Sequence, residues 1–86
     1  MSDQASPVVL AALRDVLEKQ MAANDPPETG ATLDRLRQSG VDEDTAWRLL
    51  SAVLLQEMSI IVREGRTFDR EGYVEALRRL PDLVDR

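Results

Sequence analysis

The sequence of 86 residues contains no cysteine and no histidine, and only three of its residues are aromatic. Without these two residue types the chain lacks thiol nucleophiles, imidazole bases and the usual ligands of zinc. Disulfide bonds are excluded as well, so the composition does not indicate an oxidising compartment. No glycine-rich phosphate loop and no nucleophile motif occurs either. We therefore expect no cofactor, no metal site and no enzymatic activity.

Positive charge and long hydrophobic runs are also scarce. The chain has 16 acidic and 11 basic residues, for a net charge of -5, which disfavours attraction to nucleic acid or to an anionic membrane. The longest unbroken apolar run, Val8 to Leu13, is far shorter than the roughly 20 residues of a membrane span, and no secretory signal precedes it. All but one of the basic residues are Arg, which is compatible with a GC-rich bacterial genome. We expect a bacterial, cytoplasmic protein without a membrane partner.

Residue patterns with helical spacing predict an all-α domain over residues 1–86, with short, loosely ordered tails at 1–5 and 82–86. The predicted helices lie near residues 7–23, 26–39, 42–64 and 69–80. No stretch alternates polar and apolar residues as a half-buried strand does. Helix-capping residues and glycines mark the boundaries, with Asp25 expected to cap the second helix and Glu28 to complete its capping box. The other boundary residues are Ser6, Pro7, Pro26, Gly40, Asp42, Gly65 and Asp69.

The third predicted helix is apolar over most of its circumference, which favours a central position among the four. Only a narrow polar side interrupts it, made by Arg48, Ser51, Gln56 and Ser59. The other three helices each have one apolar stripe that we expect to be buried. The stripes are Val9, Leu10, Leu13, Val16, Leu17 and Met21 in the first helix, Thr29, Leu33 and Leu36 in the second, and Tyr73, Leu77 and Leu80 in the last.

Two short motifs are distinctive. The second predicted helix opens with Asn-Asp-Pro-Pro-Glu-Thr at residues 24–29, and the last is preceded by Gly-Arg-Thr-Phe-Asp at residues 65–69, with Tyr73 following. With the leucines between them, these motifs make residues 24–81 resemble a family of small, uncharacterised bacterial all-helical domains. Phe68 and Tyr73 are spaced as a hydrophobic staple at the start of the last helix. The resemblance implies the helical fold and no particular activity.

Glu57 is the one charged residue on the apolar side of the third helix, with Glu64 two turns further on nearly the same face. A buried carboxylate without a partner costs several kcal/mol, so Glu57 needs one. It can pair with an Arg or accept N–H groups from the start of another helix. Alternatively, this face of the third helix is an interface and Glu57 pairs with a residue across it. A third possibility is that Glu57 binds a metal ion or takes part in a reaction, for which the chain offers no histidine partner.

Trp47 and Met58 flank the same apolar side, and Trp is frequent at binding hot spots. A single Trp in a helical domain is more often part of the core, so core and interface both remain open for Trp47. Residues 33–50 also resemble a helix-turn-helix, with Gly40 in its turn. However, the second helix of that motif would present Asp42, Glu43 and Asp44 to DNA, whose phosphates would repel them.

The function most consistent with these features is a non-enzymatic protein-interaction or structural module. The reason is the third helix, whose apolar surface three shorter helices do not fully cover. A homodimer is the simplest way to cover the remainder, since two-fold dimers are the commonest oligomers, and an unknown protein partner is the other. Nucleic-acid binding through residues 33–50 is the alternative.

Overall fold

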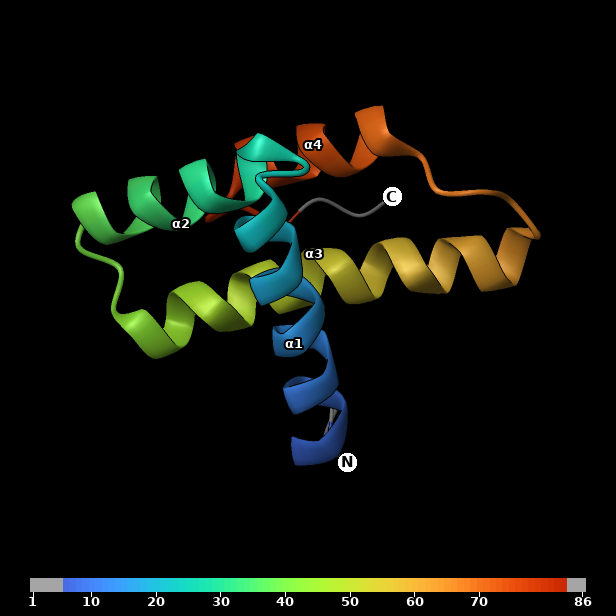
Figure 1. Ribbon diagram of the computed structural model, residues 1–86, viewed down its shortest axis with the longest axis horizontal. Helices are drawn as coiled ribbons and strands as arrows, with labels where there is room; N and C mark the ends of the chain where they lie inside the picture. The colour runs from blue at the N-terminus through green and yellow to red at the C-terminus, as the bar shows by residue number, and fades with distance from the viewer. Residues whose placement is uncertain (1–5, 84–86) are drawn as a thin grey trace.

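The computed structural model describes residues 6–83, which form four α-helices and contain no strand (Figure 1). The helices are α1 (Pro7–Ala23), α2 (Pro27–Gln38), α3 (Glu43–Glu64) and α4 (Arg70–Arg79). The prediction of an all-α fold is confirmed, and every helix boundary lies within one residue of its predicted position. The predicted tail at 1–5 and the last three residues of the predicted tail at 82–86 lie outside the described residues. At Asp82, the backbone N–H closes a turn onto the carbonyl of Arg79.

Polar side chains cap the N-termini of α1, α3 and α4, as the sequence predicts. The side chains of Ser6, Asp42 and Asp69 each accept a backbone N–H from the first turn of the helix that follows, which satisfies a donor that has no partner inside the helix. Two glycines follow helix ends with positive φ angles, 91° at Gly40 and 63° at Gly65. Glycine is needed at both positions because other residues are strained there.

The start of α2 differs from the prediction. Asp25 does not cap the helix, because Pro26 occupies the N-cap position and Pro27 is the first helical residue. The carboxylate of Asp25 instead lies 2.7 Å from the guanidinium of Arg70, at the start of α4. The predicted capping box is also wrong, since the Glu28 carboxylate points to Arg78, 3.5 Å away. Both partners come from α4, so the neighbouring sequence could not reveal them.

α3 lies at the centre of the structure, as predicted, and is the longest helix. α2 folds back over the first half of α3, and α4 lies beside α2 on the same side (Figure 1). α1 crosses α3 near its middle and does not run alongside it (Figure 1). One hydrophobic core joins all four helices. Its buried members are Leu13, Leu17, Leu33, Leu36, Ala46, Leu50, Val53, Leu54, Tyr73, Ala76, Leu77 and Leu80.

The predicted stripes of α2 and α4 are buried throughout, which confirms them. The prediction that the α1 stripe is buried is only half right, because Leu13 and Leu17 are buried but Val9 and Val16 are exposed. Because α1 crosses α3, only the part of α1 near the crossing is covered. Ser51 also differs from its predicted place on a polar surface, since it is buried near the first turns of α1.

Candidate interaction surface

The carboxylate of Glu57 is fully buried and anchors the start of α4. Its Oε2 atom accepts the backbone N–H of Asp69, the N-cap residue of α4, at 3.0 Å. A negative charge at this position also interacts favourably with the positive end of the helix dipole. This is the predicted arrangement in which Glu57 accepts an N–H from the start of another helix. The alternative of a contact across an interface is wrong, because the side chain has no exposed surface.

The opposite end of α4 is held by Arg35 of α2. The Arg35 guanidinium donates hydrogen bonds to the carbonyls of Leu80 and Leu77, at 2.7 and 3.1 Å. These carbonyls lie at the negative end of the helix dipole, where a cation is favourable. α4 therefore has a carboxylate at its start and a guanidinium at its end, each from a different helix. No local pattern in the sequence marks Arg35, because its partners are more than 40 residues away.

A third polar link joins α1, α2 and α4 inside the fold. The Gln20 side-chain oxygen accepts hydrogen bonds from the hydroxyls of Thr29, at 2.8 Å, and Tyr73, at 3.0 Å. Burial raises the pKa of Tyr73, so its hydroxyl stays protonated and continues to donate. The ring of Tyr73 packs edge-on against Phe68, with centroids 5.4 Å apart, which confirms the predicted staple. The side chains of Gln20, Thr29 and Tyr73 therefore all have hydrogen-bond partners within the chain.

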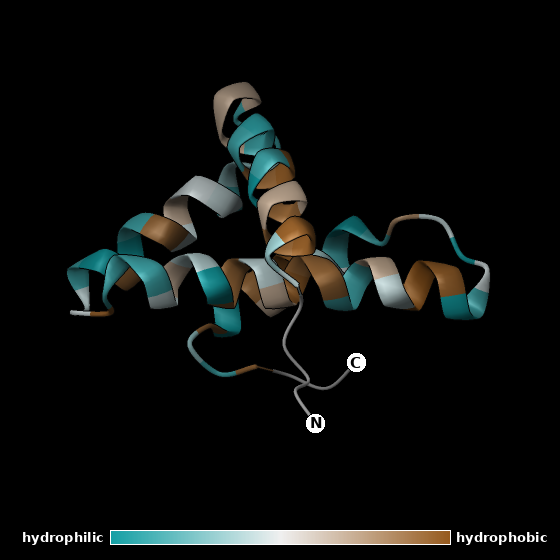
Figure 2. Ribbon diagram, turned by 90° about the horizontal axis from the view of Figure 1, so that it is seen from below, coloured by the Kyte–Doolittle hydropathy of each residue, from teal (hydrophilic) through white to brown (hydrophobic). Residues whose placement is uncertain are grey.

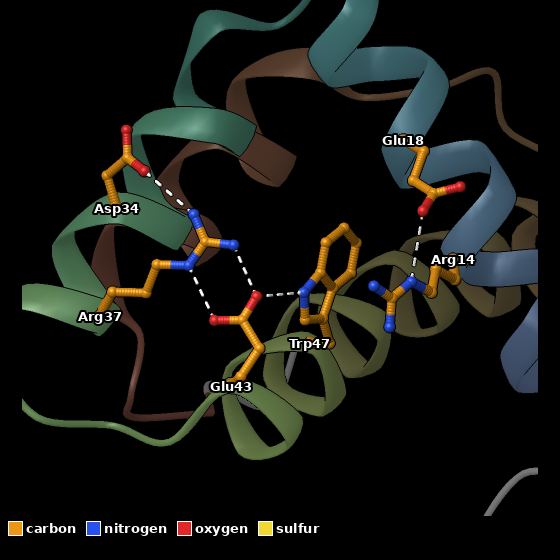
Figure 3. Close-up of polar contacts among 6 residues, drawn as sticks. All are labelled: Arg14, Glu18, Asp34, Arg37, Glu43 and Trp47. Atoms are coloured by element: carbon orange, nitrogen blue, oxygen red, sulfur yellow. Dashed lines mark hydrogen bonds and ion pairs between the residues drawn. The ribbon is translucent and has the colours of Figure 1, made fainter.

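Trp47 lies at the edge of the core, half-buried and fixed by charged neighbours (Figure 3). Its indole N–H donates to the Glu43 carboxylate at 3.0 Å, and the Arg14 guanidinium lies 4.1 Å from the centre of its ring, a cation–π contact. Glu43 also accepts a hydrogen bond from Arg37 at 2.8 Å. The bonds from Arg37 and Trp47 lower the pKa of Glu43 to about 2. Trp47 thus packs against its own chain, as the core interpretation predicts.

The corner between α2 and α3, which resembles a helix-turn-helix in sequence, has acidic residues at the start of α3. Asp42 accepts hydrogen bonds from Thr45, and Asp44 forms an ion pair with Arg48 at 2.8 Å. Glu43 is held by Arg37, as described above. The first turn of α3 therefore presents three carboxylates where a DNA-reading helix would need to approach phosphates.

An apolar groove lies between α1 and α3 and has a volume of about 630 Å³. The hydrophobic residues that line it are Val8, Val9, Ala12, Leu13 and Val16 of α1 and Leu55, Met58 and Val62 of α3. Val62 and Val8 are 83% and 78% exposed, and Met58 is 44% exposed. Figure 2 shows hydrophobic ribbon at the start of α1 and on α3 beside it. Among residues 6–83, the polar residues that line the groove are Ser59 and Arg63.

The structure separates the four residues that the sequence singled out. Met58 lines the apolar groove, Glu57 is in the interior, and Trp47 packs against the edge of the core near the start of α3. Glu64 is exposed at the end of α3, with its carboxylate 3.3 Å from Arg66, and it does not join Glu57. The contribution of α1 to the groove could not be predicted from the sequence, because the hydrophobic stripe of α1 predicts burial.

No family model matches the chain, and no curated protein or solved structure is significantly similar to it. The resemblance over residues 24–81 therefore stays a prediction. Within residues 6–83, no group of three or more acidic side chains is placed to hold a metal ion.

α3 is long and apolar enough to cross a membrane by length and composition alone, with a mean hydropathy of 1.3 over its most apolar window. The central helix of a water-soluble bundle meets the same criterion, and 39% of this window is buried within the fold. The remaining apolar surface of α3 includes the wall of the groove.

Proposed function

We propose that this protein is a non-enzymatic protein-interaction module that binds an amphipathic helix in the groove between α1 and α3. The observation that supports the proposal is the groove itself, an exposed and continuous hydrophobic surface between two helices. Monomeric soluble proteins seldom leave such a surface uncovered unless it is used. A groove between two helices suits a third helix, whose apolar side chains fit between the two walls.

The chemistry of the lining indicates how a partner helix would bind. Burial of an exposed valine or methionine side chain contributes roughly 1.5–3 kcal/mol when complete, so Val8, Met58 and Val62 supply most of the available energy. Arg63 is charged and exposed at the edge, where it favours a partner with an acidic residue beside its apolar stripe. Hydrophobic burial thus provides affinity, and Arg63 helps to fix orientation.

Nucleic-acid binding through residues 33–50 has less support. The carboxylates of Asp42, Glu43 and Asp44 and the net charge of -5 both oppose it. The location that we propose, the bacterial cytoplasm, rests on the sequence composition alone.

Site-specific photo-cross-linking in cells tests the proposal. A photoreactive amino acid replaces Val62 in the groove, and in a matched control it replaces Glu75, which is exposed on the outer side of α4. We expect a covalent protein adduct from position 62 and none from position 75. If position 62 gives no more adduct than position 75, the groove does not bind protein and the proposal is wrong.

A further inference from the structure

The N-terminal half of α1, residues 7–16, is here called the arm. Beyond its crossing with α3, the arm extends away from α2 and α4 (Figure 1). Val8, Val9, Ala12 and Val16 leave an exposed apolar stripe along it. The arm is therefore itself an amphipathic helix with no cover on one side, and its exposed stripe forms the α1 wall of the groove.

Because one chain carries both the helix and the groove, we infer that the groove binds the arm of a second copy of this chain. The inference rests on the proposed function and names its partner. In a two-fold dimer the contacts are reciprocal, so each arm lies in the groove of the other copy. We place the two-fold axis perpendicular to the arms, so that the two arms run antiparallel and each also packs against α3 of its partner. This arrangement covers Val8 and Val62 of both copies at once.

A dimer interface of ordinary size would have to draw on both helices of this face. A stable interface buries about 800 Å² per partner, which is about a seventh of the 5533 Å² that the chain exposes. At 1.5 Å per residue, α1 and α3 are about 25 and 33 Å long. Because Leu13, Leu17 and Leu50 are buried in the core, such an interface would draw on the arm and on the second half of α3.

The charges at the edges of this face are complementary between copies. Arg63 lines the groove on α3, and its guanidinium is exposed. The arm carries Asp15 beside its apolar stripe, three residues after Ala12, and the Asp15 carboxylate is also exposed, 2.9 Å from Lys19. Antiparallel arms bring Asp15 of one copy towards Arg63 of the other. Opposite charges at the rim orient the two copies even though each chain is acidic overall.

Sedimentation velocity over a range of micromolar concentrations tests whether a second copy binds. We compare the unchanged protein with Val62→Lys, and use Ala31→Lys as the control because Ala31 is exposed on α2 and the change in charge is equal. Both variants should fold, because lysine has a high helix propensity and the side chains of Val62 and Ala31 are both exposed. We expect dimers for the unchanged protein and Ala31→Lys, and a dissociation constant at least about tenfold higher for Val62→Lys. A monomer at every concentration overturns the inference, as does equal dimerisation of all three proteins.

Disulfide trapping tests whether the arm is the part that binds. The chain has no cysteine of its own, so one chain with Ala12→Cys is mixed with another with Val62→Cys. The control mixture pairs Ala12→Cys with Glu75→Cys. We expect the mixed 12–62 disulfide to form much faster than the 12–75 disulfide. If the chain dimerises but the two rates are equal, the arm does not lie in the partner's groove and the inference is wrong.

The photo-cross-link at position 62 separates failure of this inference from failure of the proposed function. An adduct of twice the 9.6 kDa mass of the chain supports a second copy. An adduct of any other mass, together with a monomer in sedimentation, overturns the second-copy inference but leaves the interaction module standing. The absence of any adduct contradicts both.

Discussion

The two sides of α3 contain similar residues but have different surroundings. On one side, Leu50 is completely buried beneath α2 and α4, and buried polar groups such as Glu57 are hydrogen-bonded. On the other side, Leu55 is 37% exposed and Met58 and Val62 are more so. The apolar pattern of α3 continues around the helix, whereas the other helices cover only part of it. Two helices packed along α3 close one side, and one helix crossing it leaves the other side open.

This difference shows what a hydrophobic pattern does and does not specify. A pattern identifies surface that must be covered, but the covering element can belong to the same chain or to another. The predictions below test whether the two sides of α3 differ in energy as they differ in structure.

Leu50→Ala and Leu55→Ala compare the two sides directly, because both delete the same atoms from the same helix. We expect Leu50→Ala to lower the free energy of unfolding by about 3 kcal/mol, since it leaves a cavity in the core. Leu55→Ala should cost less than about 1 kcal/mol in dilute protein, because its side chain is already partly hydrated. Urea denaturation at low concentration measures both. Equal losses would mean that the exposed side of α3 is covered in the isolated chain.

Glu57→Leu tests the buried carboxylate on the closed side. Leucine cannot accept the Asp69 N–H, so a buried donor loses its partner, and we expect a loss of about 2 kcal/mol in the free energy of unfolding. Glu57→Gln keeps an oxygen that can accept the same N–H and should lose about half as much. Urea denaturation of both variants measures this. If neither unfolds more easily than the unchanged protein, Glu57 does not anchor α4.

Arg35→Met removes the guanidinium at the end of α4 while keeping much of the apolar stem. We expect a loss of about 1 kcal/mol, because the carbonyls of Leu77 and Leu80 lose a charged donor. Arg48→Met is the control, since it removes an exposed ion pair with Asp44 and should cost less than about 0.5 kcal/mol. Thermal or urea unfolding compares the two. Equal effects would show that Arg35 acts no differently from an exposed arginine.

The smallest effect concerns the exposed contact of Glu43 with Arg37 and Trp47. The folded pKa of about 2 lies below the ordinary value of 4.5, so the contact stabilises the fold fully above about pH 4.5. That stabilisation is lost as the pH falls through about 2. NMR titration of the Glu43 carboxyl, with Trp47 fluorescence as a second signal, should show this midpoint. In Arg37→Gln the pKa should rise towards 4.5, and an unchanged value would contradict the assigned cause.

Much of the fold could be predicted because its signals are local. Caps such as Ser6 and Asp69 satisfy N–H groups within their own turn, so their neighbours in sequence reveal them. The buried stripes of α2 and α4 follow from helical spacing alone. The pairings of Asp25 with Arg70 and of Arg35 with α4 could not be predicted, because they depend on how distant helices pack.

The candidate site was predicted only in part for the same reason. Excess apolar surface on α3 follows from composition, and Met58 was singled out on that ground. The other wall of the groove depends on the angle between α1 and α3, which no local pattern encodes. The hydrophobic stripe of α1 therefore predicted burial for Val9 and Val16, whereas the crossing leaves both exposed.

The crossing of α1 over α3 also bears on how the chain folds. The core anchors α1 from Leu13 onwards, through Leu13, Leu17 and the hydrogen bonds of Gln20, so the first two turns of the arm have little tertiary support. A helix that short is marginal in water. If a partner helix fills the groove, as proposed, its binding should stabilise these first turns as a helix. Helix content in this segment should then report how far the groove is occupied.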